Sequence, residues 1–245
     1  MLGIMALILL TGASSIQAVA PSVRGEIVQP EKNHFSYDHQ EEWEFVSGKM
    51  QSPINIDTSK VVDYLGSGLE LNYEQVGTYV DNNGHSIQVG LRGTAEIDDR
   101  KFSISQVHFH SPSEHTLDGK HFPLEGHFVH QAQNGRIAVI GVMFNVGRHN
   151  EAFQQILDAA KLLPQGKSEV KIDHLKLSRV LPYQFSYYHY SGSLTTPPLT
   201  ENVEWYILIE SVTISQEQLK EFHQYYDHNN RDIQELHDRK VFKRE

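Results

Sequence analysis

Three histidines in two neighbouring apolar segments are the residues of this chain most able to do chemistry. His108 and His110 alternate with Val107 and Phe109, and His127 lies in the next apolar segment. If both segments are β-strands, side chains alternate between the two faces, so His108 and His110 share one face. Burying several imidazoles together is costly unless their nitrogens find partners. Two adjacent strands with these faces aligned would bring three imidazoles together, as a catalytic zinc with an open fourth position requires.

A possible hydrogen-bond acceptor lies two positions before two of these histidines. Gln106 precedes His108 and Glu125 precedes His127, each on the same strand face as its histidine. A metal-bound imidazole usually donates its second N–H to such a group, which fixes its tautomer. The alternative is a set of structural histidines, because an H-x-H pair alone is a weak signal and spacing does not prove convergence. Three further histidines are expected to be structural or exposed: His115, His121 and His130.

The elements that must position these residues are short strands. From Gln51 onward, apolar runs with alternating polar residues are separated by turn residues. The expected strands are the runs at 53–56, 69–73, 85–91, 101–111, 126–132, 136–147 and 203–209. One helix is expected between Asn150 and Pro164, and another after Ser215, where Gln218 completes a capping box. No linker or repeat divides the chain, so the pattern predicts a single strand-dominated domain.

The overall composition narrows the classes of partner and of metal site. The 245 residues carry a formal net charge of −10, which disfavours nucleic acid and anionic membrane surfaces as partners. Fifteen histidines favour acid–base or metal chemistry. There is no cysteine, which excludes disulfides, cysteine zinc sites and iron–sulfur clusters. Any metal must therefore bind nitrogen or oxygen.

The first 20 residues have features of a secretory signal peptide. The apolar run from Leu2 to Leu10 is too short to span a bilayer, and the small residues at 18–20 resemble a cleavage site. The alternative is an uncleaved apolar tail, because no Lys or Arg precedes the run and Pro21 follows the site. We therefore expect a signal peptide at 1–20 and one domain at 21–245. The protein would work in the periplasm or be secreted, with no stable membrane insertion after cleavage.

Several motifs of the chain resemble those of the α-class carbonic anhydrases. They are MQSPINI at 50–56, DNNGHS at 81–86, QVHFHSPSEHTLDGKHFPLEGHFVH at 106–130, YSGSLTTPPLTENVEW at 190–205 and NNR at 229–231. The resemblance runs in order along nearly the whole chain after the N-terminal segment. It implies a zinc-dependent lyase that reversibly hydrates carbon dioxide to bicarbonate and a proton, through attack by zinc hydroxide and a histidine proton shuttle.

The same resemblance implies a fold. It is a mainly β (α+β) single domain, with a central, largely antiparallel, twisted sheet of about ten strands, short peripheral helices, and zinc at the base of a conical cleft. Inhibition by sulfonamides and a possible homodimer are further expectations from the family. Two other functions remain open. One is a recognition module of this fold, and the other is an exported zinc-binding protein without significant hydratase activity.

The resemblance also assigns a role to each candidate metal-site residue. His108, His110 and His127 match the zinc ligands of the family. Gln106 and Glu125 match the hydrogen-bond partners of the first and third ligand. The family assignment thus coincides with the strand-face argument made from the residues alone.

Further roles are implied for residues around the metal. Thr195 matches a threonine that accepts a hydrogen bond from zinc-bound hydroxide, and Glu114 matches the carboxylate that takes that threonine's proton. His85 matches the proton shuttle, since an imidazole with a pKa near neutrality both accepts and releases protons. Tyr37 matches a tyrosine of the solvent network. The residues that match the apolar carbon dioxide site and the adjoining anion site are Val129, Val139, Leu194, Thr196, Val203 and Trp205.

Three positions depart from the family pattern. Phe35-Ser36-Tyr37 replaces the usual Trp-Gly-Tyr, and Leu199 stands where many secreted bacterial members have a disulfide cysteine. Asp232 follows NNR, where proline is usual. We expect altered packing at the N-terminal edge, lower stability, and a looser loop after residue 231. None of the three positions is a candidate ligand.

Overall fold

The computed structural model describes residues 35–44, 48–163 and 169–245. The signal peptide predicted at 1–20 lies outside the described residues. Within the part of the chain that is described, no helix has the length and apolar character needed to cross a membrane.

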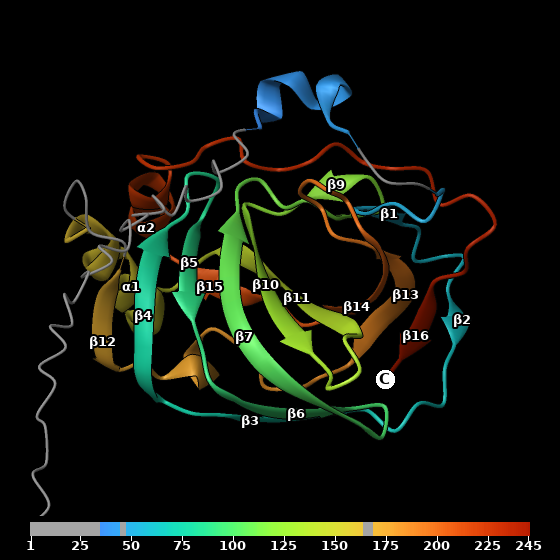
Figure 1. Ribbon diagram of the computed structural model, residues 1–245, viewed down its shortest axis with the longest axis horizontal. Helices are drawn as coiled ribbons and strands as arrows, with labels where there is room; N and C mark the ends of the chain where they lie inside the picture. The colour runs from blue at the N-terminus through green and yellow to red at the C-terminus, as the bar shows by residue number, and fades with distance from the viewer. Residues whose placement is uncertain (1–34, 45–47, 164–168) are drawn as a thin grey trace, which may run out of the picture. The chain divides into compact units, whose positions relative to one another are not determined.

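The described chain is organised around one large mixed sheet (Figure 1). Its main path contains ten strands in the order β12, β4, β5, β7, β10, β11, β14, β13, β16, β2. Neighbours on this path pair antiparallel except for β11 with β14 and β16 with β2. The predicted large, mostly antiparallel sheet is therefore confirmed, although it contains thirteen strands among the described residues and not the ten expected. The bounds are β12 (Val170–His174), β4 (Val76–Asn82), β5 (Ile87–Gly90), β7 (Arg100–His110), β10 (Leu124–Gln131), β11 (Ile137–Val146), β14 (Glu201–Leu208), β13 (Tyr187–Ser193), β16 (Phe242–Arg244) and β2 (Val62–Asp63).

Additional strands join this sheet through its central strands β7 and β11. β3 (Leu69–Tyr73) pairs with β6 (Gly93–Ile97), which joins the long strand β7, and β15 (Val212–Ile214) pairs with β11. A separate small sheet contains β1 (Asn55–Ile56), β8 (Thr116–Leu117) and β9 (Lys120–His121). Each of the seven predicted strand segments contains or overlaps an observed strand.

Both predicted helices form, with the caps that the sequence indicates. α1 (Glu151–Lys161) begins after Asn150, whose side chain accepts a hydrogen bond from the backbone of Phe153. α2 (Gln216–Phe222) begins after Ser215, which forms the predicted capping box with Gln218. The two short 3-10 helices are η1 (Tyr37–Glu42) and η2 (Leu177–Arg179).

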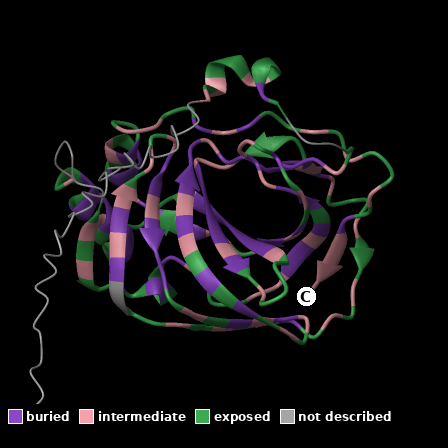
Figure 2. Cartoon of the chain, in the orientation of Figure 1, coloured by how far each residue is buried: buried purple, intermediate pink, exposed green. Residues whose placement is uncertain are grey.

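The helices cover one face of β7 and leave the other face to the histidines. Phe109 of β7 lies 5.3 Å from Phe153 of α1 and 6.5 Å from Phe222 of α2, measured between ring centroids. Because side chains alternate along a strand, His108 and His110 point away from this aromatic contact. Figure 2 shows that the central strands β10 and β11 contain long buried stretches, whereas β7 alternates between buried and more exposed residues. The apolar core therefore packs against the face of β7 opposite His108 and His110.

Candidate metal centre

Strand pairing brings the three candidate zinc ligands together. His108 of β7 lies directly opposite His127 of β10, and His110 lies opposite Glu125. The ring centroids are 5.2 Å apart for His108 and His127, 4.9 Å for His108 and His110, and 4.7 Å for His110 and His127. One nitrogen from each ring lies within 4.8 Å of the others. This spacing can accommodate one metal ion between three imidazoles.

One nitrogen of each ring lies next to a polar group of the protein, by hydrogen bond for His108 and His110 and by ion-pair contact for His127. Nδ1 of His108 is 2.9 Å from Oε1 of Gln106, and Nδ1 of His110 donates to the backbone oxygen of Asn229 at 2.5 Å. Nε2 of His127 lies 3.0 Å from Oε1 of Glu125. The inward nitrogens, Nε2 of the first two and Nδ1 of the third, are thus left for a metal. Nε2 of His110 is buried and has no hydrogen-bond partner among the described residues, which fits a ligand atom.

The environment sets the charge of these groups. Burial lowers the pKa of His108, and the adjacent imidazoles lower it further. Burial also lowers the pKa of His110, although the charge of Glu114 opposes this. Burial acts against protonation of His127 as well, but Glu125 outweighs it and raises the pKa. Burial alone would raise the pKa of Glu125, yet His115 and His127 hold it well below its usual value. Glu125 is therefore a carboxylate in this site.

Glu114 is fully buried beside the triad. Its Oε1 accepts a hydrogen bond from the backbone N–H of Arg231 at 2.7 Å. Its Oε2 lies 3.9 Å from Nδ1 of His127 and has no hydrogen-bond partner among the described residues. The hydrogen bond expected from Thr195 is not present in this structure, so Oε2 is a buried acceptor without a donor among the described residues. Thr195 itself is buried, with 5% exposure.

Comparisons with known proteins agree with this geometry. Residues 36–245 match the family model of eukaryotic-type carbonic anhydrases. The chain is 40% identical over 200 residues to a carbonic anhydrase of Pectobacterium carotovorum, covering 79% of each sequence. The solved α-carbonic anhydrase of Thermovibrio ammonificans, in complex with the inhibitor sulfanilamide, has a TM-score of 0.75 and 41% identity, with 80% of this chain and 88% of that chain covered. Dioscorin complexed with ascorbate has the same TM-score of 0.75 at 30% identity, with 81% and 87% covered.

This chain belongs to the α-class carbonic anhydrases. It is a zinc enzyme that catalyses the reversible hydration of carbon dioxide.

An apolar cluster adjoins the triad of this carbonic anhydrase. Val139, Val203 and Trp205 are buried in it, and Val129 and Leu194 pack against it while partly exposed. The ring of Trp205 lies 4.8 Å from that of His127, which joins the cluster to the metal site. Five residues predicted for the carbon dioxide site therefore belong to one apolar cluster, which contacts the triad through Trp205 and His127. Thr196 is partly exposed beside Thr195.

His85 and Tyr37 lie in segments that contact each other. The His85 ring stacks on Phe35, with centroids 3.8 Å apart and an interplanar angle of 16°. Phe35 also contacts the ring of Tyr37 edge-on at 5.5 Å. The hydroxyl of Tyr37 is buried without a partner among the described residues. Burial and the charge of Glu114 raise the pKa of Tyr37 well above its usual value, so this phenol keeps its proton.

Asn229 is a site residue that the sequence reasoning did not assign. Its backbone oxygen accepts from His110, and its side-chain oxygen accepts from the backbone of Ser111 at 2.9 Å. Its side-chain nitrogen donates to the backbone oxygens of His85 and Phe109, each at 2.9 Å. The NNR motif contained this residue, but its role depends on contacts more than 100 positions away along the chain.

Asp232 connects the loop after NNR to η1 through its backbone. Its backbone N–H donates to Oε1 of Gln40 at 2.8 Å, and Nε2 of Gln40 donates to the backbone oxygen of Asn230 at 3.3 Å. A proline at position 232 could not make the first bond, because it has no N–H. The aspartate at this position thus adds a contact between the loop and η1, and the looser loop stays a prediction.

Histidines 115, 121 and 130 are hydrogen-bonded, as expected of structural residues. Nδ1 of His121 is 2.6 Å from the backbone oxygen of Ser113, and Nε2 of His130 is 2.7 Å from the hydroxyl of Tyr73. His115 is fully buried and lies 2.8 Å from Glu125. His115 therefore contacts the carboxylate that also faces the candidate ligand His127.

Proposed function

We propose that His108, His110 and His127 hold the zinc ion of this enzyme. The observation that carries the proposal is the convergence of three ring nitrogens within 4.8 Å, while the opposite nitrogens already face Gln106, Asn229 and Glu125. When bound, zinc lowers the pKa of a coordinated water to about 7 and so supplies a nucleophile near neutral pH. The buried, neutral state of His108 and His110 favours metal binding over proton binding.

Thr195 and Glu114 orient the reacting oxygen in this proposal. A threonine hydroxyl that donates to a carboxylate has only lone pairs left, so it accepts a hydrogen bond from the nucleophile and directs the nucleophile's free lone pair toward the substrate. Two observations support this role. Oε2 of Glu114 is a buried acceptor with no partner among the described residues, and Oε1 is held by the backbone of Arg231.

Carbon dioxide would bind against the apolar cluster beside the triad. The molecule is small and uncharged, so apolar contact is its main source of binding free energy. The cluster formed by Val129, Val139, Leu194, Val203 and Trp205 supports this proposal, because Trp205 reaches the ring of His127. Thr196 would contact the anionic product, since it follows Thr195 and is partly exposed.

His85 would carry the released proton to buffer, with Tyr37 contributing to the solvent network. His85 is intermediate in exposure, so its imidazole can exchange protons with solvent. Its backbone is tied to Asn229, which also contacts the His110 ligand. These bonds support a fixed relation between the shuttle loop and the metal-binding strand.

Export and inhibition are further parts of the proposal. The apolar segment at 1–20 would be removed as a signal peptide, leaving the domain from residue 21 in the periplasm or outside the cell. The structure of the Thermovibrio ammonificans relative contains sulfanilamide, which supports sulfonamide inhibition here. A homodimer is proposed by analogy with the family.

Stopped-flow carbon dioxide hydration, with zinc measured on the same sample, tests the proposed function. We expect one zinc per chain and rapid hydration that a sulfonamide abolishes. One zinc without hydration would instead favour the alternative of an exported zinc-binding protein. The similarity to dioscorin makes this control necessary, because the fold alone does not establish the activity. A triple His→Ala variant at positions 108, 110 and 127 should lose both zinc and hydration.

A further inference from the structure

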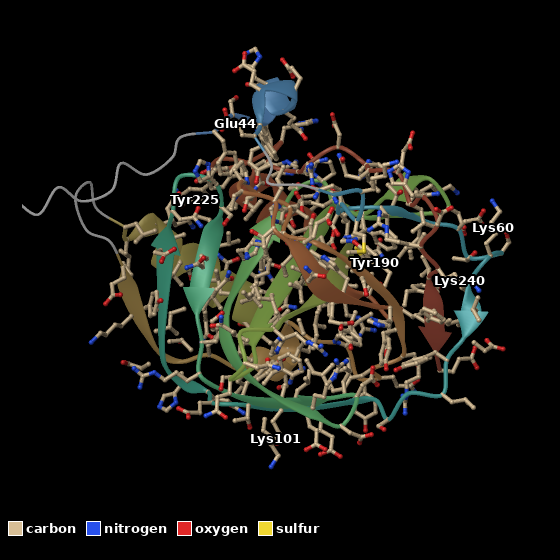
Figure 3. All side chains as sticks on the ribbon, turned by 45° about the vertical axis from the view of Figure 1, so that its right-hand side comes forward. Glu44, Lys60, Lys101, Tyr190, Tyr225 and Lys240 are labelled. Carbon is tan, nitrogen blue, oxygen red and sulfur yellow. The ribbon has the colours of Figure 1, made fainter. Side chains whose placement is uncertain are left out.

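A buried chain of polar groups continues behind the carboxylate that faces the third ligand. Nδ1 of His115 is 2.8 Å from Oε1 of Glu125, and Nε2 of His115 is 2.7 Å from the hydroxyl of Tyr190. The same hydroxyl is 2.8 Å from Oγ of Ser52. All four side chains are at most 1% exposed. Tyr190 is labelled in Figure 3, where it lies in the interior close to the ribbon of β13.

Glu125 is the end of this chain and the group that faces His127. Its Oε2 accepts from the backbone N–H groups of Glu114 and His115, at 2.8 and 2.9 Å. Its Oε1 lies between Nδ1 of His115 at 2.8 Å and Nε2 of His127 at 3.0 Å. Because one oxygen faces both imidazoles, a change in the orientation or tautomer of His115 moves the carboxylate that orients His127.

The hydrogen-bonding capacities select one arrangement of protons. A neutral His115 that donates from Nδ1 to Glu125 has a lone pair on Nε2, so it must accept there. Tyr190 has a single hydroxyl hydrogen, and donating it to Nε2 satisfies that lone pair. Ser52 can then donate to the tyrosine oxygen, while its own oxygen accepts from the backbone N–H of Ser193 at 3.0 Å. Every group in the chain is then satisfied without a second charge in the interior.

The backbone next to Tyr190 leaves room for this contact. A Cβ atom on Gly192 would lie 2.1 Å from Oγ of Ser52 and 2.8 Å from the ring of Tyr190. Any larger residue at position 192 would therefore separate Ser52 from Tyr190. Ser52 can approach Tyr190 this closely because the backbone of β13 has a glycine, without a Cβ atom, at position 192.

We propose that Tyr190 is a positioning residue for the zinc site, acting through His115 and Glu125 on the His127 ligand. By donating to Nε2, Tyr190 keeps His115 in the tautomer that donates to Glu125. Glu125 is thereby held in the orientation that fixes the His127 ring with Nδ1 inward. The inference deepens the proposed function and depends on His127 being a zinc ligand.

The first test compares zinc affinity in Tyr190→Phe and Tyr187→Phe. Tyr187 is the matched control, because it is equally buried and its hydroxyl donates to Oδ1 of Asp98 at 2.9 Å, outside this chain of groups. Zinc dissociation constants are measured by competition with a chelator on the full-length protein, and urea unfolding is measured on the same samples. We expect Tyr190→Phe to weaken zinc binding about tenfold, in the range of other metal-supporting hydrogen bonds, and Tyr187→Phe to change it less than twofold.

The comparison separates positioning from ordinary structural support. If both variants lose similar stability and neither changes zinc affinity, Tyr190 has only a structural role and the inference is overturned. If the wild-type protein binds no zinc, the proposed metal site fails first, which is a different outcome. Equal weakening in both variants would also overturn the inference, because a general loosening of the fold would then explain it.

A second measurement needs no substitution. Long-range proton–nitrogen NMR correlations on the zinc-loaded wild-type protein report which nitrogen of each histidine carries a proton. We expect His115 to be neutral, with the proton on Nδ1 and an acceptor Nε2. A His115 protonated on Nε2, alone or on both nitrogens, would contradict the proposed direction of the chain.

Discussion

At the scale of single residues, the site pairs some of its polar atoms with protein groups and leaves others without a hydrogen-bond partner among the described residues. His108, His110 and His127 each have one nitrogen occupied by a neighbour and one directed inward. Glu114 has one oxygen held by the backbone of Arg231 and one that is free among the described residues. This asymmetry is what a metal site with an oriented nucleophile requires.

Thr195→Ala should keep zinc but reduce kcat/KM for hydration roughly a hundredfold, as for loss of one oriented hydrogen-bonding group. The reason is that Glu114 and the nucleophile would no longer be connected through the threonine hydroxyl. Stopped-flow hydration and zinc analysis on the same preparation measure both quantities. Thr213→Ala, at an exposed position of β15, serves as the control and should retain wild-type rates. Unimpaired hydration in Thr195→Ala would remove the orienting role.

His85→Ala should lower kcat in weak buffer and leave kcat/KM nearly unchanged, because only the transfer of the proton to solvent is slowed. Added imidazole should restore much of the lost turnover. His174→Ala, at the exposed end of β12, is the control and should behave as wild type. A parallel fall of kcat and kcat/KM would mean that His85 affects the chemistry itself.

At the scale of elements, the helices stabilise the strand that carries the ligands without touching the site. α1 and α2 contact the Phe109 side of β7, while His108 and His110 occupy the other side. The α1 cap also joins several segments. Asn150 accepts from Phe153 with its side-chain oxygen and donates to the backbone oxygens of Arg179 and Thr213 with its side-chain nitrogen.

Asn150→Ala should therefore destabilise the protein by about 2 kcal/mol, because the cap and two further hydrogen bonds are lost. Ser215→Ala, which removes the simpler cap of α2, should cost about 1 kcal/mol. Urea unfolding measures both values. Hydration per folded molecule should remain that of wild type in each variant, since neither residue contacts the metal site. A large activity loss at equal folded fraction would show that the helices also shape the site.

At the scale of the whole molecule, stability must come from packing and hydrogen bonds, since the sequence has no cysteine. Where secreted bacterial relatives have a disulfide, Leu199 is buried and its backbone oxygen accepts from Gln51 at 3.2 Å. The neighbouring Glu201 accepts from Gln51 and from the backbone of Met50, at 3.1 and 2.7 Å. Polar contacts thus join the segment around Leu199 to the segment at Met50 and Gln51.

The buried His130 should make the molecule less stable in mild acid. Burial lowers the pKa of its imidazole to about 4, from an ordinary value of 6.5. The unfolded chain therefore binds a proton that the folded chain excludes, and stability falls as the pH drops from 6.5 toward 4. Between pH 7 and pH 5 this group should remove about 2 kcal/mol of the free energy of unfolding.

Urea unfolding of His130→Gln at both pH values tests this contribution. From pH 7 to pH 5, the free energy of unfolding should fall by about 2 kcal/mol less in the variant than in wild type. This difference does not depend on the stability of the variant at pH 7. His174→Gln, at an exposed position, should keep the wild-type pH dependence. An unchanged pH dependence in His130→Gln would mean that His130 has an ordinary pKa in the folded protein.

The sequence by itself determined the local parts of this protein. Alternating apolar residues identified strands such as β3 and β7, and the residues Asn150 and Ser215 identified the helix starts, because these signals act over a few neighbouring positions. Family motifs predicted His108, His110 and His127 as zinc ligands, because these motifs are continuous in the sequence. Short strands such as β2 and β16 were not predicted, since two or three residues carry no periodic signal.

Only the tertiary structure decided which distant groups meet. Register between β7 and β10 sets His108 opposite His127, and a shift of one residue would turn one histidine to the other face. The contacts of Asn229 with His85 and His110, of Asp232 with Gln40, and of Tyr190 with His115 join segments far apart in the chain. Such contacts depend on how the whole chain packs, because hydrogen-bond geometry is a property of atoms in space and leaves no periodic pattern in the sequence.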